Sequence, residues 1–233
     1  MEIQSHRGNA VGFVENTLEA FQNIISKGVA SIESDVRFTK DKVLVLHHDG
    51  ELGRVFEGVE QVKNLTYLEL QGRKNLILPD KKAHIPSLSD VLDLCKLSGC
   101  KINIEFKLEE YQNYQSLVKA VLAMVNEKDM TNLVYYSSFH FPALTYLRTL
   151  EKRDCFWLLE QMIPGLADYL PAIDFQGFHM DIKVWRHLPE NIKNDLKNAG
   201  IVRLWTVNDK TDIELARKDG IDTIITDQAL ELI

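Results

Sequence analysis

The chain has 233 residues, of which 45% are apolar and 26% charged, a composition typical of one folded globular domain and not of a disordered, collagenous or coiled-coil chain. Its 34 acidic and 27 basic residues give a net charge of -7, which disfavours a nucleic-acid partner because like charges repel phosphate backbones. No window approaches the roughly 18 to 20 uninterrupted apolar residues of a spanning helix, and the first residues lack a signal-peptide pattern. We therefore expect a cytoplasmic protein with no stable membrane insertion.

Short β-branched runs alternate with helical patterns along the chain. The runs predict strands at residues 3–6, 31–38, 43–47, 101–107, 133–138, 155–160, 175–180, 202–207 and 223–226. Helices are predicted at 17–27, 88–97, 111–128, 142–152, 189–198 and 211–218, with a weaker pattern near 165–170. Strands that alternate with helices favour a parallel sheet joined by right-handed crossovers.

The second and third strands are too close together for a crossover. Only residues 39–42 separate them, so 31–38 and 43–47 are expected to form an antiparallel hairpin, which leaves eight β/α units. A chain of 233 residues fits a compact (β/α)₈ barrel, whose typical size is about 250 residues. We predict a single α/β domain over residues 1–233, a TIM barrel. A doubly wound open sheet is the competing fold.

Residues 49–87 interrupt the alternation with glycines and prolines scattered among charged positions. We predict a small, loop-rich insertion here. Because the segment follows a strand end and precedes the next helix, we expect it over the carboxyl-end face of the barrel, where substrate loops gather.

Carboxylates stand at the ends of two neighbouring predicted strands, where barrels carry their catalytic groups. Glu33 and Asp35 are two residues apart and so face the same side of a strand, and Glu105 with Lys107 repeats this spacing. Three converging carboxylates repel one another unless a cation compensates. All-oxygen ligation suits one divalent cation, Mg²⁺ or Ca²⁺. The alternative is an ordinary ion network in which Arg37 and Lys107 pair with the carboxylates.

His6 and His48 are the candidate acid and base, because imidazole titrates near the working pH. His48 is followed by Asp49, a carboxylate able to orient the ring. Arg7 and Lys107 are available to hold phosphate oxygens, which implies a phosphate ester as substrate. The chain has no motif typical of a P-loop, a dinucleotide site or a serine hydrolase. Further polar residues at later strand ends are Ser137, Ser138, Glu160, His179, Asp181, Asn208 and Asp227.

An ordered set of short motifs runs along the chain. The set is His6-Arg7-Gly8, Glu15-Asn16-Thr17, Glu33-Ser34-Asp35, Thr39-Lys40-Asp41, His48-Asp49, Ile104-Glu105-Phe106-Lys107, Leu204-Trp205-Thr206-Val207-Asn208 and Ile224-Ile225-Thr226-Asp227. With these motifs the chain resembles the glycerophosphodiester phosphodiesterases over nearly its whole length, and it is similar to their short cytoplasmic bacterial members. It departs from them at Val55-Phe56 in the insertion, where the family has threonines.

The resemblance implies a barrel with a small insertion, a divalent cation, and hydrolysis of a small-molecule glycerophosphodiester to an alcohol and sn-glycerol 3-phosphate. It implies metal ligation by Glu33, Asp35 and Glu105, acid/base work by His6 and His48, and phosphate contact by Arg7 and Lys107. Trp205 is expected either to pack against a glycerol or headgroup carbon skeleton or to lie in the core. The acid and base roles of the two histidines stay interchangeable, and the attacking group is water or a glycerol hydroxyl.

Two rival functions stand beside this prediction. One is a phospholipase D-type hydrolase acting on lysophospholipids, whose secreted members usually carry disulfides. Three cysteines without Cys-x-x-Cys spacing do not indicate such a framework. The other is a non-catalytic barrel, for which loss of a ligand carboxylate or a histidine is expected, and all five of these residues are present.

Overall fold

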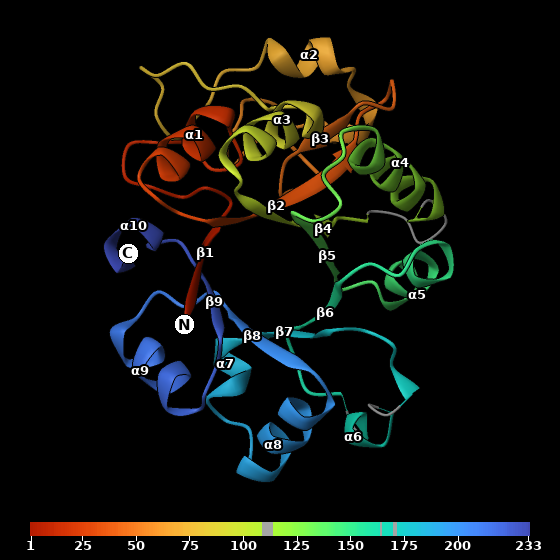
Figure 1. The fold of residues 1–233 in the computed structure, drawn as a ribbon. Coiled ribbons are helices and arrows are strands. Elements are labelled where there is room, and N and C mark those ends of the chain that lie inside the picture. Colours follow the sequence, from red (N-terminus) through yellow and green to blue (C-terminus); the bar gives the residue numbers. More distant parts are fainter. Residues whose placement is uncertain (109–113, 164, 170–171) are drawn as a thin grey trace.

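The computed structural model describes residues 1–108, 114–163, 165–169 and 172–233. Within them the strands form a ring with the helices around its outside (Figure 1). The strands are β1 Glu2–His6, β2 Ser31–Phe38, β3 Leu44–Leu46, β4 Lys101–Phe106, β5 Val134–Ser138, β6 Cys155–Leu159, β7 Gly177–Asp181, β8 Ile201–Trp205 and β9 Thr223–Thr226. The helices are α1 Leu18–Ser26, η1 Val62–Asn64, α2 Tyr67–Gln71, α3 Leu88–Ser98, α4 Tyr114–Glu127, α5 Phe141–Leu150, α6 Leu166–Tyr169, α7 Ile182–Trp185, α8 Glu190–Ala199, α9 Lys210–Lys218 and α10 Ala229–Leu232.

The sheet closes on itself. Its strand order is β1-β9-β8-β7-β6-β5-β4-β2-β3, and a further parallel pairing joins β1 to β2. β3 pairs with β2 antiparallel and stands outside the ring, so the barrel has eight parallel strands. The predicted TIM barrel and its hairpin are confirmed, and the competing open sheet is wrong.

Several predicted boundaries differ from the observed ones. The strand predicted at 202–207 spans Ile201–Trp205, and the one predicted at 175–180 spans Gly177–Asp181. The short helices α2 and α7 were not predicted, because four or five residues carry too little helical periodicity to be recognised. Of the helix predicted at 111–128, residues 111–113 lie outside the described residues, and so does residue 170 of the weak helix at 165–170.

Helix ends in the sequence carry their own signals. The Ser87 side chain accepts from the backbone N–H of Asp90, and the Asp90 side chain accepts from the Ser87 backbone, a capping box that starts α3. The helix ends at Gly99, whose φ of 72° places it in the left-handed region. Thr17 starts α1 by accepting from the Ala20 N–H. These caps fix where the helices join the strands.

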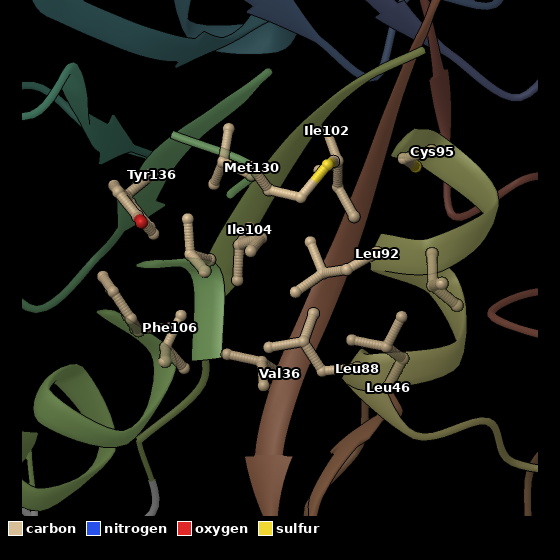
Figure 2. Close-up of a cluster of buried hydrophobic side chains, with 14 of the residues drawn as sticks. Val36, Leu46, Leu88, Leu92, Cys95, Ile102, Ile104, Phe106, Met130 and Tyr136 are labelled. Carbon is tan, nitrogen blue, oxygen red and sulfur yellow. The ribbon is translucent and has the colours of Figure 1, made fainter. Parts of the chain in front are cut away.

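Apolar packing lies mainly between the strands and the surrounding helices. Ile102 and Ile104 of β4 point outward and meet Leu88 and Leu92 of α3, with Tyr136 of β5 beside them (Figure 2). All five side chains are fully buried. Burying a side chain of this size stabilises the fold by roughly 1.5–3 kcal/mol. The outer shell therefore holds the strands in place.

The barrel interior is polar, unlike the branched apolar filling usual for this fold. The Gln4 side chain donates to Ser31 Oγ at 2.6 Å and to the Tyr135 hydroxyl. The Arg203 guanidinium lies between two rings, 4.4 Å from the Tyr135 centroid and 4.2 Å from that of Phe156. This layer fills the interior between the carboxyl end of the barrel and a separate hollow at the amino end, which Glu2, Lys101 and Arg203 help to line.

The segment predicted as an insertion has a small core of its own. Val55 and Phe56 are each 1% exposed and pack in one cluster with Leu70 and Ile85. Val55 and Phe56, which stand where the resemblance leads us to expect threonines, are therefore packing residues. Other residues of the segment line a surface hollow together with His48 and Lys107, namely Gly50, Glu51, Gln61 and Lys63. In the described residues, no helix combines the length and apolarity needed to cross a membrane.

Candidate active site

Three carboxylates meet inside the carboxyl end of the barrel. Glu33 and Asp35 come from β2 and Glu105 from β4, and Asp35 is the register partner of Glu105. Side chains alternate along a strand, so all three face the interior. One oxygen from each lies within 4.8 Å of the others, and the residues are 4%, 0% and 7% exposed, respectively. The cluster predicted from the spacing is thus a single buried cup.

Two cations accompany these acids. Lys107 Nζ lies 2.6 Å from Glu105 Oε1 and 3.2 Å from Asp35 Oδ1. Arg7 Nε lies 3.3 Å from Asp35 Oδ2. The expected ion network therefore exists around Asp35 and Glu105. Arg37, also expected in it, donates to the carbonyl oxygens of His47 and His48 at 3.0 and 3.1 Å.

The charges in the cup remain unbalanced. Burial, with the neighbouring carboxylates, raises the pKa of Glu33 well above its ordinary value. Burial also raises the pKa of Glu105 to about 7, although Lys107 opposes the shift. For Asp35 burial is outweighed by Lys107 and Arg7, and its pKa lies below the usual range. Three carboxylates face two cations here, so full ionisation calls for additional positive charge.

The surroundings of Glu33 Oε1 indicate whether a metal ion fits in the cup. This oxygen is buried and has no hydrogen-bond partner among the described residues. An orphaned, buried carboxylate oxygen is costly unless something positive contacts it. An all-oxygen donor set of three carboxylates suits a hard divalent cation. The cup therefore fits such an ion, and an ion network alone leaves Glu33 unexplained.

A tight turn after β1 brings Arg7 to the cup. Arg7 has φ 55° and Gly8 φ 69°, a left-handed pair that glycine tolerates readily. A Cβ on Gly8 would stand 2.8 Å from a ring carbon of Phe21, so α1 packs directly on this turn. The Arg7 backbone N–H donates to the carbonyl oxygen of Glu33 at 3.0 Å. The turn thereby places a cation next to the β2 carboxylates.

His6 is held by a carboxylate from the other end of the chain. Its Nδ1 donates to Asp227 Oδ1 at 2.7 Å, and its Nε2 lies 4.0 Å from Glu33 Oε2. Asp227 also accepts from the side-chain amides of Asn9 at 2.6 Å and Asn208 at 2.7 Å. Burial of Asp227 is outweighed by its bond to His6, which keeps the pKa of this carboxyl below its ordinary value. The His6 ring is thus fixed with Nε2 toward the cup.

A carboxylate also holds His48. Its Nδ1 donates to Asp49 Oδ1 at 2.8 Å. Asp49 accepts from Arg54 Nε at 2.6 Å, and Arg54 reaches Glu15 with two further bonds of 2.9 and 2.7 Å. Burial lowers the pKa of His48; Asp35 opposes this shift and Lys107 adds to it. Each histidine therefore presents Nε2 for proton transfer.

A pocket of about 300 Å³ lies over the cup and is lined by every predicted site residue except Asp35, which is buried beneath it. Trp205 stands on the pocket wall rather than in the core. Its Nε1 donates to the His179 carbonyl oxygen at 3.0 Å, and its ring meets that of Phe139 edge to face at 5.6 Å. Phe139 and Glu160 also line this pocket, at the opening that is here called its mouth.

The orienting role of Asp49 agrees with the sequence prediction. The sequence places Asp227 only among the polar strand ends, and it assigns no role to Asn9 or Arg54. The pair of Asp227 with Asn208 carried a weak signal, since both follow neighbouring strands of a barrel. Asn9 carried none, because 218 positions separate it from Asp227.

Known proteins share this architecture. The model of the glycerophosphoryl diester phosphodiesterase family matches residues 6–231. The chain belongs to this family. It is 30% identical to a glycerophosphodiester phosphodiesterase of Caldanaerobacter subterraneus subsp. tengcongensis over 99% of this chain and 96% of the relative. It is also 30% identical to one of Bacillus altitudinis, over 97% and 94%. The structure of an Oleispira antarctica phosphodiesterase in complex with the product sn-glycerol-3-phosphate superposes with a TM-score of 0.89 at 19% identity, covering 100% of this chain and 95% of that one.

Proposed function

We propose that the chain is a metal-dependent phosphodiesterase that hydrolyses glycerophosphodiesters to an alcohol and sn-glycerol 3-phosphate. One observation carries the proposal: two histidines, each tied through Nδ1 to a carboxylate, flank a buried cup of three acids in a pocket. The Oleispira antarctica phosphodiesterase of the same fold binds sn-glycerol-3-phosphate, which supports a glycerol phosphate in this pocket. Family membership supports the same class of substrate.

Glu33, Asp35 and Glu105 would hold Mg²⁺ or Ca²⁺. When bound, such a cation withdraws electron density from the phosphoryl group and offsets the charge that develops on it. The Glu33 oxygen that lacks a partner and the raised pKa of Glu105 both support a cation in this position.

Arg7 and Lys107 bind the non-bridging phosphate oxygens in the proposed reaction. Both are mostly buried, with 15% and 13% of their side chains exposed, and both line the pocket. Charge-assisted hydrogen bonds from a planar guanidinium hold two oxygens at once, whereas an ammonium acts as a point charge. Together they stabilise the negative charge that grows on phosphate during attack.

His6 and His48 move the protons. Nε2 of one ring accepts the proton of the attacking oxygen, which belongs to water or to the glycerol hydroxyl beside the ester. Nε2 of the other ring donates a proton to the oxygen of the leaving alcohol. Asp227 and Asp49 keep Nδ1 of each ring engaged, so proton exchange at Nε2 does not turn the ring.

The first test measures release of glycerol 3-phosphate from glycerophosphocholine, glycerophosphoethanolamine and glycerophosphoglycerol with Mg²⁺, with Ca²⁺ and after chelation. We expect turnover with at least one metal and loss after chelation. Turnover that survives thorough chelation would remove the metal from the proposal. Absence of turnover on all three compounds would refute the substrate class.

Replacing His48 by alanine tests the proton-transfer step. Loss of a general acid or base lowers kcat roughly 10²- to 10⁴-fold. His187→Ala is the matched control, because His187 is exposed and lies outside the pocket. A His48→Ala variant that keeps more than about a tenth of the activity contradicts the assigned role. A substrate analogue without the glycerol hydroxyl beside the ester tests the attacking group, since equal rates would exclude attack by that hydroxyl.

A further inference from the structure

Beneath the cup lies a set of buried polar side chains that the proposed chemistry does not use. Asn103 of β4, Ser137 of β5 and His179 of β7, here called the polar floor, line the same pocket. They are 1%, 0% and 0% exposed. Asn103 is the register partner of Glu33, and Ser137 is that of Glu105. The polar floor therefore directly adjoins the carboxylate cup.

Every polar side-chain atom of the polar floor is without a partner. Asn103 Nδ2 and Oδ1, Ser137 Oγ and both ring nitrogens of His179 make no hydrogen bond to any described residue. A buried polar group left unpaired costs about 1–3 kcal/mol. Such a concentration on one pocket wall indicates a ligand or water that supplies the missing bonds.

The polar floor is uncharged, which limits what it can bind. Burial, together with the nearby Arg203, holds the pKa of His179 well below its ordinary value, so the ring is neutral, with one donor and one acceptor nitrogen. Asn103 adds two donors and an acceptor, and a serine hydroxyl serves as both. These groups match alcohol hydroxyls, which also donate and accept. A phosphate or an ammonium group finds its counter-charges in the cup above instead.

The walls and the base of this region suit a short carbon chain. Leu158 and Ile225 line the pocket beside the polar floor and supply apolar contact. Directly below, His179 stacks on Phe156 with centroids 4.7 Å apart, and Arg203 fills the space between Phe156 and Tyr135. These packed side chains stand in the way of a long acyl chain, so we expect none to pass through the barrel.

We propose that Asn103, Ser137 and His179 bind the free hydroxyls of the substrate's glycerol unit, so that glycerol enters the barrel first and the leaving alcohol stays at the mouth near Phe139 and Glu160. This inference rests on the proposed function and names its specificity determinant. It predicts tolerance toward different alcohol groups, because they remain outside. It also predicts that an acyl chain on glycerol, as in a lysophospholipid, is rejected.

The strand β5 offers a matched pair of variants for the test. Ser137 and Ser138 are neighbours with 0% and 1% exposure, but they face opposite sides of the strand. Ser138 Oγ donates to the Phe106 carbonyl oxygen at 3.0 Å and is not part of the pocket over the cup. Ser137→Ala removes a group of the polar floor, and Ser138→Ala removes an equally buried hydroxyl elsewhere. His179→Phe, with a ring of similar shape, provides a second variant of the polar floor.

Each variant is assayed on glycerophosphocholine and on an analogue with propane-1,2-diol in place of glycerol. The analogue lacks the terminal hydroxyl but keeps the one beside the ester. We expect wild type to prefer glycerophosphocholine at least about tenfold in kcat/KM, one good hydrogen bond to a substrate hydroxyl being worth about this factor. Ser137→Ala and His179→Phe are expected to shrink this preference through KM, and Ser138→Ala to keep it. An unchanged preference in both variants of the polar floor overturns the inference, as does cleavage of lysophosphatidylcholine at the rate of glycerophosphocholine.

Calorimetry separates this inference from the proposed function. Wild type with Mg²⁺ is titrated with sn-glycerol 3-phosphate and with inorganic phosphate, which needs no turnover. Binding of the glycerol ester at least about tenfold tighter, with the advantage lost in Ser137→Ala, supports the polar floor. Equal affinity for both ligands refutes it even if glycerophosphodiesters are hydrolysed. Failure to hydrolyse any glycerophosphodiester refutes the proposed function, and the titration still decides about the polar floor.

Discussion

Replacing Asp227 by asparagine tests whether this carboxylate prepares His6 for proton transfer. All three side-chain partners of Asp227 are donors: His6 Nδ1, Asn9 Nδ2 and Asn208 Nδ2. Asn208 cannot turn its amide to help, because its Oδ1 already accepts from the backbone N–H of Asp227 at 2.9 Å and from Thr226 Oγ1. An asparagine at position 227 therefore places an NH₂ group against at least one donor.

The least costly arrangement sets that NH₂ group opposite Asn208 and leaves the oxygen facing His6. The ring then keeps its orientation but loses the negative charge beside its Nδ1. The Asp227 side chain is 35% exposed, so water screens part of this charge and the loss falls at the low end of an acid/base contribution. We expect kcat to fall about 10²-fold, which corresponds to about 2.7 kcal/mol.

The assay is steady-state release of glycerol 3-phosphate with saturating metal, with kcat and KM determined separately and the thermal midpoint measured alongside. Asp49→Asn is the matched comparison. Asp49 is already paired with Arg54 at 2.6 Å, so its charge contributes less to the ring, and we expect about a tenfold decrease in kcat. The reasoning fails if Asp227→Asn keeps kcat within about threefold of wild type, or if the whole loss appears in KM.

Three further predictions concern stability and metal binding. His47 is buried, and burial lowers its pKa from 6.5 to about 4. The unfolded chain therefore binds the proton first, so the free energy of unfolding should fall by about 3 kcal/mol as the pH drops from 6.5 to 4. In urea unfolding, the stability of His47→Phe should decline less steeply over this pH range, and a slope equal to that of wild type would contradict the prediction. Gly177→Ala places a Cβ 1.8 Å from the Ile201 carbonyl oxygen, so it should lower the free energy of unfolding in urea by about 3 kcal/mol. The control Gly72→Ala places its Cβ 3.7 Å from the Glu69 carbonyl oxygen and should cost far less. Equal urea midpoints for the two variants would show that β7 and β8 adjust freely. Mg²⁺ or Ca²⁺ should raise the thermal midpoint of wild type but not of Glu33→Gln, and a metal-induced rise of equal size in both would place the ion elsewhere.

Short-range patterns in the sequence were sufficient to predict the barrel and the carboxylate cup. The two-residue spacing of Glu33 and Asp35 directly predicts a shared face, and the same spacing of Glu105 and Lys107 extends it to the next strand. Only residues 39–42 separate the predicted strands 31–38 and 43–47, which excluded a crossover and so gave the barrel its strand count. Each of these inferences needs only local geometry.

Contacts set by barrel closure were not predictable from one sequence. The His6–Asp227 bond joins residues 221 positions apart, and it exists because β1 pairs with β9. The sequence places Ser137 and His179 among the polar strand ends, but the role of the polar floor was missed for a different reason. Alternation along β4 and β5 shows which residues share a face, but both faces of these strands are buried, so it does not reveal that Asn103 and Ser137 lack partners there.

The division between an apolar outer shell and a polar interior also explains how the site is tolerated. Unpaired polar atoms of the interior each cost about 1–3 kcal/mol, and the apolar contacts of β4 with α3 offset this without entering the barrel. Strands held from outside leave their inward residues available for ligand binding. A ligand that completes the missing hydrogen bonds removes the cost only in the folded state, so it stabilises the fold as it binds. In the proposed function, the same atoms that weaken the empty barrel would select a ligand whose hydroxyls complete their hydrogen bonds.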